Sequence, residues 1–390
     1  MRILIVSHGV IGNDSGVGRV HYEIMKEYRK AGHHVDKVDY ADLYPNGQGH
    51  FGKIFDVSIT RKILAYLQAN AWKYDVIEAN AECVVYPKEK FGFKGLLFVR
   101  SHGARPLGEA AKDRKSIKEA FKKEKKERKL RTVLGLTIRY FHKKMSVKGY
   151  FLSIQYADIV HCLNKAELRY LLSIGVSRER IICLPNALPS HILGSLEMKN
   201  KKRKYNSSII SFVAAWRIFK GIKDWREISA SLLRTDSIRK IVLLGTTWPE
   251  DLVRNDFDIG LQSLLQVVTS FKPAELPQLL YPVKVGIFTS YTEGFGFAVV
   301  EQLASGIPTV AYDISGVQDI LQELSDLLLV EPGNVPMLVE KAKYILEMEA
   351  EEYEELSLKC IKISKKYTLE DIAPLYLQKF EEYYYKNGQL

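Results

Sequence analysis

The sequence predicts an α/β protein made of two Rossmann-like, doubly wound domains in series, facing a central cleft. The chain has 390 residues, of which 46% are hydrophobic, so it is long enough for two domains that each bury a core. Short apolar runs alternate with segments of helical periodicity twice along the chain, as in parallel sheets with crossover helices. The polar stretch from Glu197 to Ser208 lies between the two series and predicts a linker.

The first series predicts an N-terminal domain over residues 1–190. "RILIVS", from Arg2 to Ser7, is typical of a buried parallel strand, and a glycine-rich turn follows it. Apolar positions from Val17 to Tyr28 then fall at helical spacing, and Gly32 is a natural stop for that helix. The remaining expected elements are strands at "HHVDKVDY", "DVIEA", "GLLFVRSHG", "ADIVHCL" and "RIICLPNALP", with helices around 63–72 and over 164–173.

The second series predicts a C-terminal domain over residues 191–368. Its expected elements are strands at "IISFVAAW", "KIVLLGTTW", "LLQVVTS", "VKVGIFTS", "IPTVAYD" and "LLLVE", with helices over 222–233 and through Glu301. The final segment, 369–390, is amphipathic, and we expect it to form a helix that packs back on the body, on the N-terminal domain.

The N-terminus and the cysteines indicate the cellular compartment. "MRILIVSHGV" lacks the apolar core of a signal peptide, and no window reaches about 18 uninterrupted apolar residues, so we expect a cytoplasmic protein. The four cysteines are far apart and show no metal-ligand spacing, which argues against a disulfide framework and a zinc site. We expect them to be buried small apolar residues.

The net charge of +11 is concentrated in one segment. Residues 112–148 hold 15 Lys+Arg and 4 Asp+Glu, which equals the excess of the whole chain. A solvated helix and electrostatic docking on an anionic membrane surface both explain this basic helical segment. Nucleic-acid binding is less favoured, because the run lacks interleaved aromatic residues.

The first glycine loop predicts an anion site. Gly16 and Gly18 follow a strand and open a helix, and Asp36 lies 20 residues after Gly16, as in a dinucleotide-binding fingerprint. His21 occupies the place of the third glycine, which argues against a dinucleotide. Exposed N–H groups at a helix N-terminus still favour an anion, and a tight turn without a ligand is the alternative.

The stretch "SYTEGFGFAVVEQLASG" is more specific. It places Glu293 in a loop after a strand and Glu301 about one turn inside the following helix, with glycines between them. A glycosidase pair would flank a single bond with both carboxyl groups. Here a glycine loop and a helix N-terminus separate the two, which suits a phosphate with hydroxyl groups at either end. We therefore interpret the stretch as a nucleotide-sugar site.

At this point the chain resembles the retaining family 4 glycosyltransferases of the GT-B fold. Their E-x7-E signature resembles Glu293 to Glu301 within "EGFGFAVVEQLASGIPTVA". Other landmarks occur in the same order: the Gly16 loop, "RSHG", "ADIVHCLNKAEL", "LPNALP" and "WRIFKG". The sequence also departs from the family pattern. Ala215 stands where many members have an arginine, and Ser315-Gly316 replaces Gly-Gly.

The resemblance implies roles for individual residues. Glu293 would hold hydroxyls of the transferred sugar, Glu301 the ribose, and Lys220 the diphosphate, while His102 would lie near the reacting centre. Arg217 would reach the diphosphate from a shifted position. The implied catalytic residues are His102, Lys220 and Glu293, and the implied donor-binding residues are Gly16, Gly18, Arg217, Lys220, Glu293, Gly294, Phe295, Gly296, Phe297 and Glu301.

The implied function is a retaining transfer of a hexose from a UDP-, GDP- or ADP-linked donor to a glycan or lipid-linked acceptor, in cell-envelope polysaccharide or glycoconjugate synthesis. Neither a metal nor another cofactor is expected, because Lys220 and N–H dipoles would stabilise the leaving group. Asp256 and Asp258 look like a metal-binding D-x-D pair, but we interpret them as surface charge. The alternative functions are a catalytically silent sugar-nucleotide-binding protein and, less favoured, a nucleic-acid-binding protein.

Overall fold

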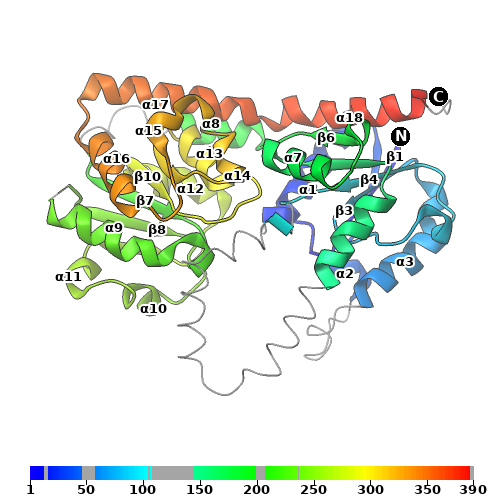
Figure 1. The fold of residues 1–390 in the computed structure, drawn as a ribbon, viewed down its shortest axis with the longest axis horizontal. Coiled ribbons are helices and arrows are strands. Elements are labelled where there is room, and N and C mark those ends of the chain that lie inside the picture. The colour runs from blue at the N-terminus through cyan, green and yellow to red at the C-terminus, as the bar shows by residue number, and fades with distance from the viewer. Residues whose placement is uncertain are drawn as a thin grey trace, which may run out of the picture. The chain divides into compact units, whose positions relative to one another are not determined.

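The computed structural model describes residues 1–12, 16–45, 58–103, 106–107, 145–198, 207–235 and 237–386 (Figure 1). Its described residues divide into two compact units: unit 1 comprises residues up to 107, residues 145–187 and the C-terminal helix from Leu369, and unit 2 comprises residues 188–368. Of the basic segment 112–148, all but residues 145–148 lies outside the described residues, and those four are helical. None of the helices in the described ranges is both long and apolar enough to cross a lipid bilayer.

Unit 1 contains a six-stranded sheet in which every described pairing is parallel. The strand order is β2-β1-β3-β4-β5-β6. The strands are β1 (Arg2–Val6), β2 (His34–Val38), β3 (Val76–Asn80), β4 (Leu96–Arg100), β5 (Ile159–Cys162) and β6 (Ile181–Cys183). Strands β3, β4 and β5 are buried along their whole length, and polar residues such as Glu78 and Asn80 are buried with them.

Helices cover both faces of this sheet because successive strand residues point to opposite sides. Ile3 and Ile5 pack under α1 (Gly16–Lys30) and α18 (Leu369–Lys386), while Leu4 and Val6 pack under α3 (Ser58–Asn70) on the other face. The other elements of unit 1 are α2 (Tyr40–Leu43), α7 (Lys165–Ser173), the helical residues 145–156, and the 3-10 turns η1 (Ala71–Lys73), η2 (Lys88–Phe91) and η3 (Arg178–Arg180).

Helix α18 is the last helix of the chain, and it packs on the sheet of unit 1 beside α1 (Figure 1). Tyr376 and Phe380 are fully buried there, and both rings contact the Phe98 ring on β4 edge-on, with centroids 6.0 and 5.1 Å away. Burial of such aromatic side chains supplies most of the attachment energy of an amphipathic helix. The chain therefore completes the core of unit 1 only with its final helix.

Unit 2 contains a second parallel six-stranded sheet, in the order β12-β11-β10-β7-β8-β9. This is the strand order of a Rossmann fold. The strands are β7 (Ile209–Val213), β8 (Lys240–Leu244), β9 (Leu265–Val268), β10 (Val285–Phe288), β11 (Thr309–Tyr312) and β12 (Leu329–Val330).

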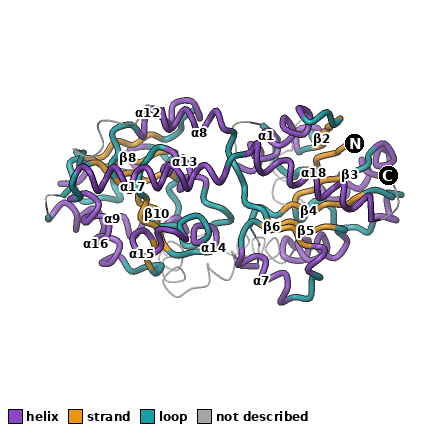
Figure 2. The backbone as a smooth tube through the Cα atoms, turned by 90° about the horizontal axis from the view of Figure 1, so that it is seen from above, coloured by secondary structure: helices purple, strands orange, loops and turns teal. Residues whose placement is uncertain are grey.

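Two groups of helices pack on this second sheet. Helix α9 (Ile222–Arg234) contacts α16 (Val335–Glu347), and α13 (Phe297–Ala304) runs beside α17 (Ala350–Ser364), as Figure 2 also shows. The remaining elements are α8 (Ser190–Met198), α10 (Glu250–Arg254), α11 (Ile259–Gln262), α12 (Leu276–Leu280), α14 (Ser315–Gln318) and α15 (Ser325–Leu328), with 3-10 turns η4 (Ile218–Lys220), η5 (Pro273–Glu275), η6 (Gln322–Leu324) and η7 (Lys365–Tyr367).

The prediction of two doubly wound α/β domains is confirmed, and each strand expected from the sequence is present. Several helices were not predicted, among them α8, α16 and α17. The predicted linker begins inside α8, where Leu196 is buried and Glu197 is still helical. With nine residues, α8 is too short to be stable alone, so packing decides the helix. Three of the four cysteines are buried as expected, and Cys183 is half-buried.

Candidate functional site

The candidate donor site of unit 2 lies where the strand order of its sheet reverses. Strand β7 starts the sheet, β8 and β9 add on one side, and β10 adds on the other, so β7 and β10 are neighbours. Ligands of open α/β sheets bind outside the carboxyl ends of such a strand pair. Lys220 follows the end of β7, and Glu293 follows the end of β10. The topology therefore places both predicted residues at the switch point.

Lys220 and Glu293 are in direct contact. The Lys220 ammonium group donates a hydrogen bond to the Glu293 carboxylate and forms an ion pair with it. The side chains are 16% and 23% exposed, so both charges still reach solvent. An ion pair that is partly open to solvent can exchange its partners at modest cost, whereas a fully buried one cannot. The pair can therefore re-form its contacts around an incoming charged ligand.

The backbone around Lys220 is fixed by its neighbour strand. Gly221 has the left-handed conformation, with φ +76°, and a Cβ atom there would lie 2.3 Å from the Thr289 carbonyl oxygen. Only glycine fits both constraints. The Tyr291 N–H also donates to the Phe219 carbonyl oxygen over 2.9 Å. These contacts hold the loop after β7 against the end of β10.

The loop that carries Glu293 leads into α13. Gly296 precedes this helix with φ +108°, a conformation that side-chain-bearing residues rarely adopt. Gly316, at the start of α14, packs against the loop: a Cβ there would lie 2.6 Å from the Glu293 carbonyl oxygen. Gly316 is thus a site residue that sequence reasoning missed, although its position in the Ser-Gly variant of a family motif could have indicated it.

Glu301 differs from Glu293 in its surroundings. It lies in the second turn of α13, as predicted, and is only 9% exposed. Phe295, in the glycine loop, is buried, with its ring 5.4 Å from the Tyr367 ring, while Phe297 is half-buried. The Phe295 side chain therefore anchors the loop in the core, which leaves its backbone N–H as the group that a ligand could use.

The other predicted donor-binding residues lie at more open positions. Arg217 is exposed and caps the 3-10 turn that carries Lys220. Gly16 is exposed at the first position of α1, with open space around its Cα, and Gly18 is buried one half-turn later. The residues between Gly12 and Gly16 lie outside the described part of the chain.

The interpretation of Asp256 and Asp258 as surface charge holds for Asp258, which is exposed, but describes Asp256 only in part, because Asp256 is half-buried. Its carboxylate accepts a hydrogen bond of 2.7 Å from the indole N–H of Trp216, which is fully buried next to the Lys220 turn, and it also accepts one from Arg226. Phe257 is buried against the Trp216 ring. A buried indole N–H needs an acceptor, and Asp256 supplies it. Asp256 therefore stabilises the Trp216 side chain and also carries charge at the surface.

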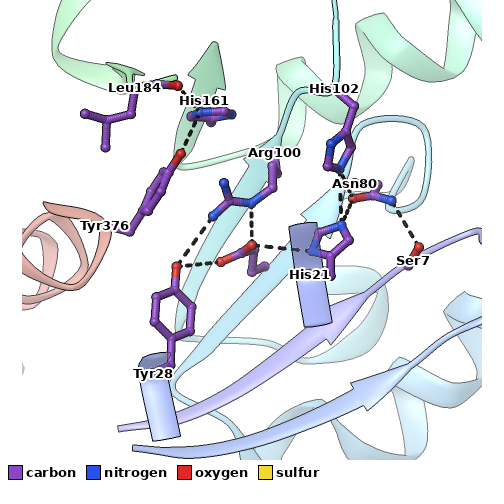
Figure 3. Close-up of polar contacts among 10 residues, drawn as sticks. Ser7, His21, Tyr28, Asn80, Arg100, His102, His161, Leu184 and Tyr376 are labelled. Carbon is purple, nitrogen blue, oxygen red and sulfur yellow. Dashed lines mark hydrogen bonds and ion pairs between the residues drawn. The ribbon is translucent and has the colours of Figure 1, made fainter. Parts of the chain in front are cut away.

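In unit 1, His102 belongs to a polar cluster at the carboxyl ends of β3 and β4 (Figure 3). His102 Nε2 lies 2.7 Å from the Asn80 side-chain oxygen and 3.2 Å from His21 Nε2. His21 Nε2 contacts the same Asn80 oxygen. His21 comes from α1, one turn after the Gly16 loop, so the residue that replaces the third glycine of a dinucleotide fingerprint points into this cluster.

Burial keeps these imidazoles neutral. Desolvation lowers the pKa of His21 to about 4, and it lowers the pKa of His102 well below its usual value of 6.5, with His21 and Arg100 acting in the same direction. Neither ring is a cation at neutral pH. His102 can thus offer hydrogen bonds to a ligand but no positive charge.

A buried ion pair lies beside this cluster. The Arg100 guanidinium pairs with Glu78, and Tyr28 of α1 donates to Glu78 over 3.1 Å. Tyr376 of α18 lies with its ring centroid 4.1 Å from the guanidinium carbon. Sequence reasoning read Arg100 only as part of the "RSHG" landmark and missed the pair, since Glu78 lies on a different strand. Removing one partner of such a pair leaves an uncompensated buried charge.

A comparison with known proteins matches the part of the chain that contains the candidate donor site. Residues 195–367 match the family model described as glycosyl transferases group 1. D-inositol 3-phosphate glycosyltransferase of Nocardia farcinica is 26% identical over 130 residues, which are 31% of this chain and 29% of that protein. 2-Deoxystreptamine glucosyltransferase of Streptomyces kanamyceticus is 32% identical over 82 residues, 21% of each chain. The matched segments thus span less than a third of either relative.

Solved structures resemble the whole chain. Sucrose-phosphate synthase from Thermosynechococcus elongatus superposes with a TM-score of 0.74 at 16% identity, covering 99% of both chains. Anabaena HepE, solved in complex with UDP, gives a TM-score of 0.68 at 16% identity and covers 98% of this chain and all of that one. The chain therefore has the GT-B fold, and its residues 195–367 match the model of the group 1 glycosyl transferases.

Proposed function

We propose that this protein is a retaining glycosyltransferase, which moves a sugar from a nucleotide-sugar donor to an acceptor. The observation that carries the proposal is the Lys220–Glu293 pair at the carboxyl ends of β7 and β10, directly before the N-terminus of α13. A cation, a carboxylate and a helix N-terminus at a sheet switch point are the groups that a sugar diphosphate requires. The match of residues 195–367 to group 1 glycosyl transferases supports the same assignment.

Charge placement gives each residue a role in this proposal. Breaking the bond between the anomeric carbon and the phosphate builds negative charge on the diphosphate and positive character on the sugar. Lys220 and the N–H groups of Gly294, Phe295 and Gly296 would stabilise the leaving diphosphate. Glu293 would release Lys220 and accept hydrogen bonds from the sugar hydroxyls, and Glu301 would hold the ribose. Arg217 and the Gly16–Gly18 loop would add further phosphate contacts.

The proposed reaction retains the configuration of the sugar without a protein base. The acceptor would attack on the face from which the diphosphate leaves, and the departing phosphate oxygen would take the acceptor's proton. We also propose that transfer requires no metal, because Lys220 and aligned N–H dipoles act where a divalent cation would otherwise act. Full activity in a chelator, unchanged by added manganese, is the expected result; strict dependence on manganese would contradict this part.

The donor is best sought first among UDP-sugars. HepE, which shares the fold, was solved with UDP and with UDP-glucose, so a uridine nucleotide is the first candidate, ahead of GDP- and ADP-sugars. The decisive experiment incubates the purified chain with each donor class and measures released nucleoside diphosphate and thermal shift. Donor binding without turnover, whichever acceptor is added, would favour the alternative of a catalytically silent sugar-nucleotide-binding protein. A salt-sensitive shift with an oligonucleotide, without donor binding, would favour the nucleic-acid alternative.

We propose a glycan or lipid-linked acceptor in cell-envelope synthesis, and a cytoplasmic location with peripheral attachment to the membrane. The support is the basic segment 112–148, whose net charge of +11 would attract anionic lipid by about 1 kcal/mol for each Lys or Arg near the surface. Sedimentation with anionic and neutral vesicles tests this: selective binding to anionic vesicles, weakened by salt, is expected. Equal binding to both kinds of vesicle would contradict membrane docking.

A further inference from the structure

Two histidine rings converge on a single amide oxygen in unit 1 (Figure 3). Asn80, at the end of β3, is 1% exposed, and its side-chain oxygen is the common partner of His21 Nε2 and His102 Nε2. The amide nitrogen of Asn80 donates to the Ser7 hydroxyl oxygen over 3.1 Å, and the Gly9 N–H donates to that same oxygen over 3.1 Å. In this network the amide lies with its oxygen toward the rings and its nitrogen toward Ser7.

The contact with Asn80 decides the tautomer of His102. A carbonyl oxygen only accepts hydrogen bonds, so the Nε2 atom of a neutral His102, 2.7 Å from that oxygen, carries the proton. His102 is therefore an Nε2–H donor toward Asn80, and its Nδ1 carries a lone pair. His21 is fully buried, whereas His102 is half-buried and is the ring that a ligand can approach. The available nitrogen of His102 is thus a hydrogen-bond acceptor.

Stability alone does not explain His21. Its Nδ1 atom is buried and has no hydrogen-bond partner within the described residues, and it lies 3.8 Å from the Glu78 carboxylate. Burying an unpaired polar atom destabilises a fold, and an apolar side chain of similar size avoids that cost. A leucine in its place would fill similar space without an unpaired atom. The His21 ring lies edge-on to the His102 ring, with centroids 5.0 Å apart, so His102 is the group that it can position.

We propose that His21 and Asn80 are positioning residues for His102, which hold its ring in the Nε2–H tautomer and present Nδ1 as an acceptor to a hydroxyl group of the substrate. This inference rests on the proposed function and on the place near the reacting centre that the family resemblance implies for His102. It adds the requirement that the ligand group facing His102 is a hydrogen-bond donor. A misplacement of such a contact by about 1 Å costs up to about 10²-fold in rate.

Three variants test the proposal. His21→Leu removes the N–H that shares Asn80, and His21→Gln restores an N–H at a similar reach. We expect His21→Leu to lower kcat/KM for the donor by about 10-fold or more without lowering the melting temperature, and His21→Gln to recover most of that loss. His34→Gln is the control: this histidine of the same unit is exposed on β2 and pairs with Asp36, so its loss should leave the melting temperature and kcat/KM unchanged.

Asn80→Asp gives a second readout, in the pH profile. The groups around His102 that shift its pKa are His21, Arg100, His161 and His8, and all of them lower it. A carboxylate at position 80 would instead favour the imidazolium form. We expect kcat/KM to be flat between about pH 6 and 8 in the wild type with respect to His102, and to fall toward pH 6 in Asn80→Asp.

The tautomer itself is measured by long-range ¹H–¹⁵N correlation spectra of histidine-labelled protein, with His102→Gln to assign the signal. Nε2–H for His102 in the wild type, with exchange between tautomers in His21→Leu, is the expected result. A proton on Nδ1 in the wild type, or equal losses of kcat/KM in His21→Leu and His21→Gln, would overturn the proposal. If no donor is turned over at all, the proposed function fails, while the spectra still decide whether His21 and Asn80 set the tautomer.

Discussion

The Thr289 hydroxyl, at the end of β10, donates a hydrogen bond of 2.8 Å to the carbonyl oxygen of Lys220, in the loop after β7. The bond joins the two loops that carry the candidate donor-site charges, and Thr289 is fully buried. Because Lys220 is thereby held by its backbone, its side chain is free to change partners. Glu293 is its partner in the structure, and a diphosphate is the partner that we propose during turnover.

Thr289→Val removes this bond while preserving the shape of the side chain. We expect the free energy of unfolding of unit 2 to fall by about 1 kcal/mol or more, since the Lys220 carbonyl oxygen loses a buried donor. Displacement of the Lys220 backbone should also lower kcat/KM. Chemical denaturation and steady-state kinetics measure the two effects. Thr289→Ser keeps the hydroxyl and should retain the activity; equal losses in both variants would refute a role for the bond.

Lys220→Ala and Glu293→Ala test the central pair. We expect each to reduce turnover by about 10²-fold or more, as the loss of a preorganised electrostatic contact does. Measurement of kcat and KM with a saturating acceptor separates transition-state stabilisation from donor binding. The exposed Lys223, on α9, provides a control at which alanine should leave turnover unchanged. Near-normal sugar transfer by either Lys220→Ala or Glu293→Ala would contradict the assignment of these residues to the donor site.

Gly316→Ala tests the packing behind the Glu293 loop. The added methyl group would lie 2.6 Å from the Glu293 carbonyl oxygen, which is backbone and cannot rotate away, so the loop must shift. We expect a several-fold higher KM for the donor and a lower melting temperature. Gly260→Ala is the matched control, because Gly260 is an exposed glycine on α11 with open space around its Cα. Unchanged donor binding in Gly316→Ala would show that the loop is not constrained from this side.

The neutral histidines of unit 1 predict a loss of stability in acid. The folded-state pKa of His21, about 4, lies below the usual value of 6.5, so the unfolded chain binds more protons between these values. Stability is therefore full above about pH 6.5 and falls as the pH drops toward 4, by about 1.4 kcal/mol per pH unit for each such histidine. His102 and His161, whose pKa values burial also lowers, add to the slope.

Denaturant titrations between pH 7.5 and 4.5 measure this slope. Carboxylates also titrate in this range, so the comparison with His21→Gln isolates the histidine contribution: the variant should show a shallower loss of stability toward acid. Parallel pH dependence in the wild type and the variant would mean that His21 is not neutral in the folded state.

Local sequence patterns by themselves determined the architecture of this protein. Apolar runs ending in glycine turns, followed by helical periodicity, specified the parallel strands and their crossover helices, because these signals depend only on neighbouring residues. The same patterns placed Lys220 and Glu293 after strands, and so at the carboxyl edge of a sheet. The glycines between Glu293 and Glu301 predicted the loop and the start of α13.

Only the tertiary structure decided which of these residues meet. Lys220 and Glu293 are 73 residues apart, and His21 and Asn80 are 59 apart, so no local periodicity relates them. Strand order brings each pair together, and strand order is set by packing between distant segments. The same reason explains the misses: Asp256 is an acceptor for Trp216, Gly316 supports the Glu293 loop, and Arg100 pairs with Glu78, all through contacts between elements that the sequence presents far apart.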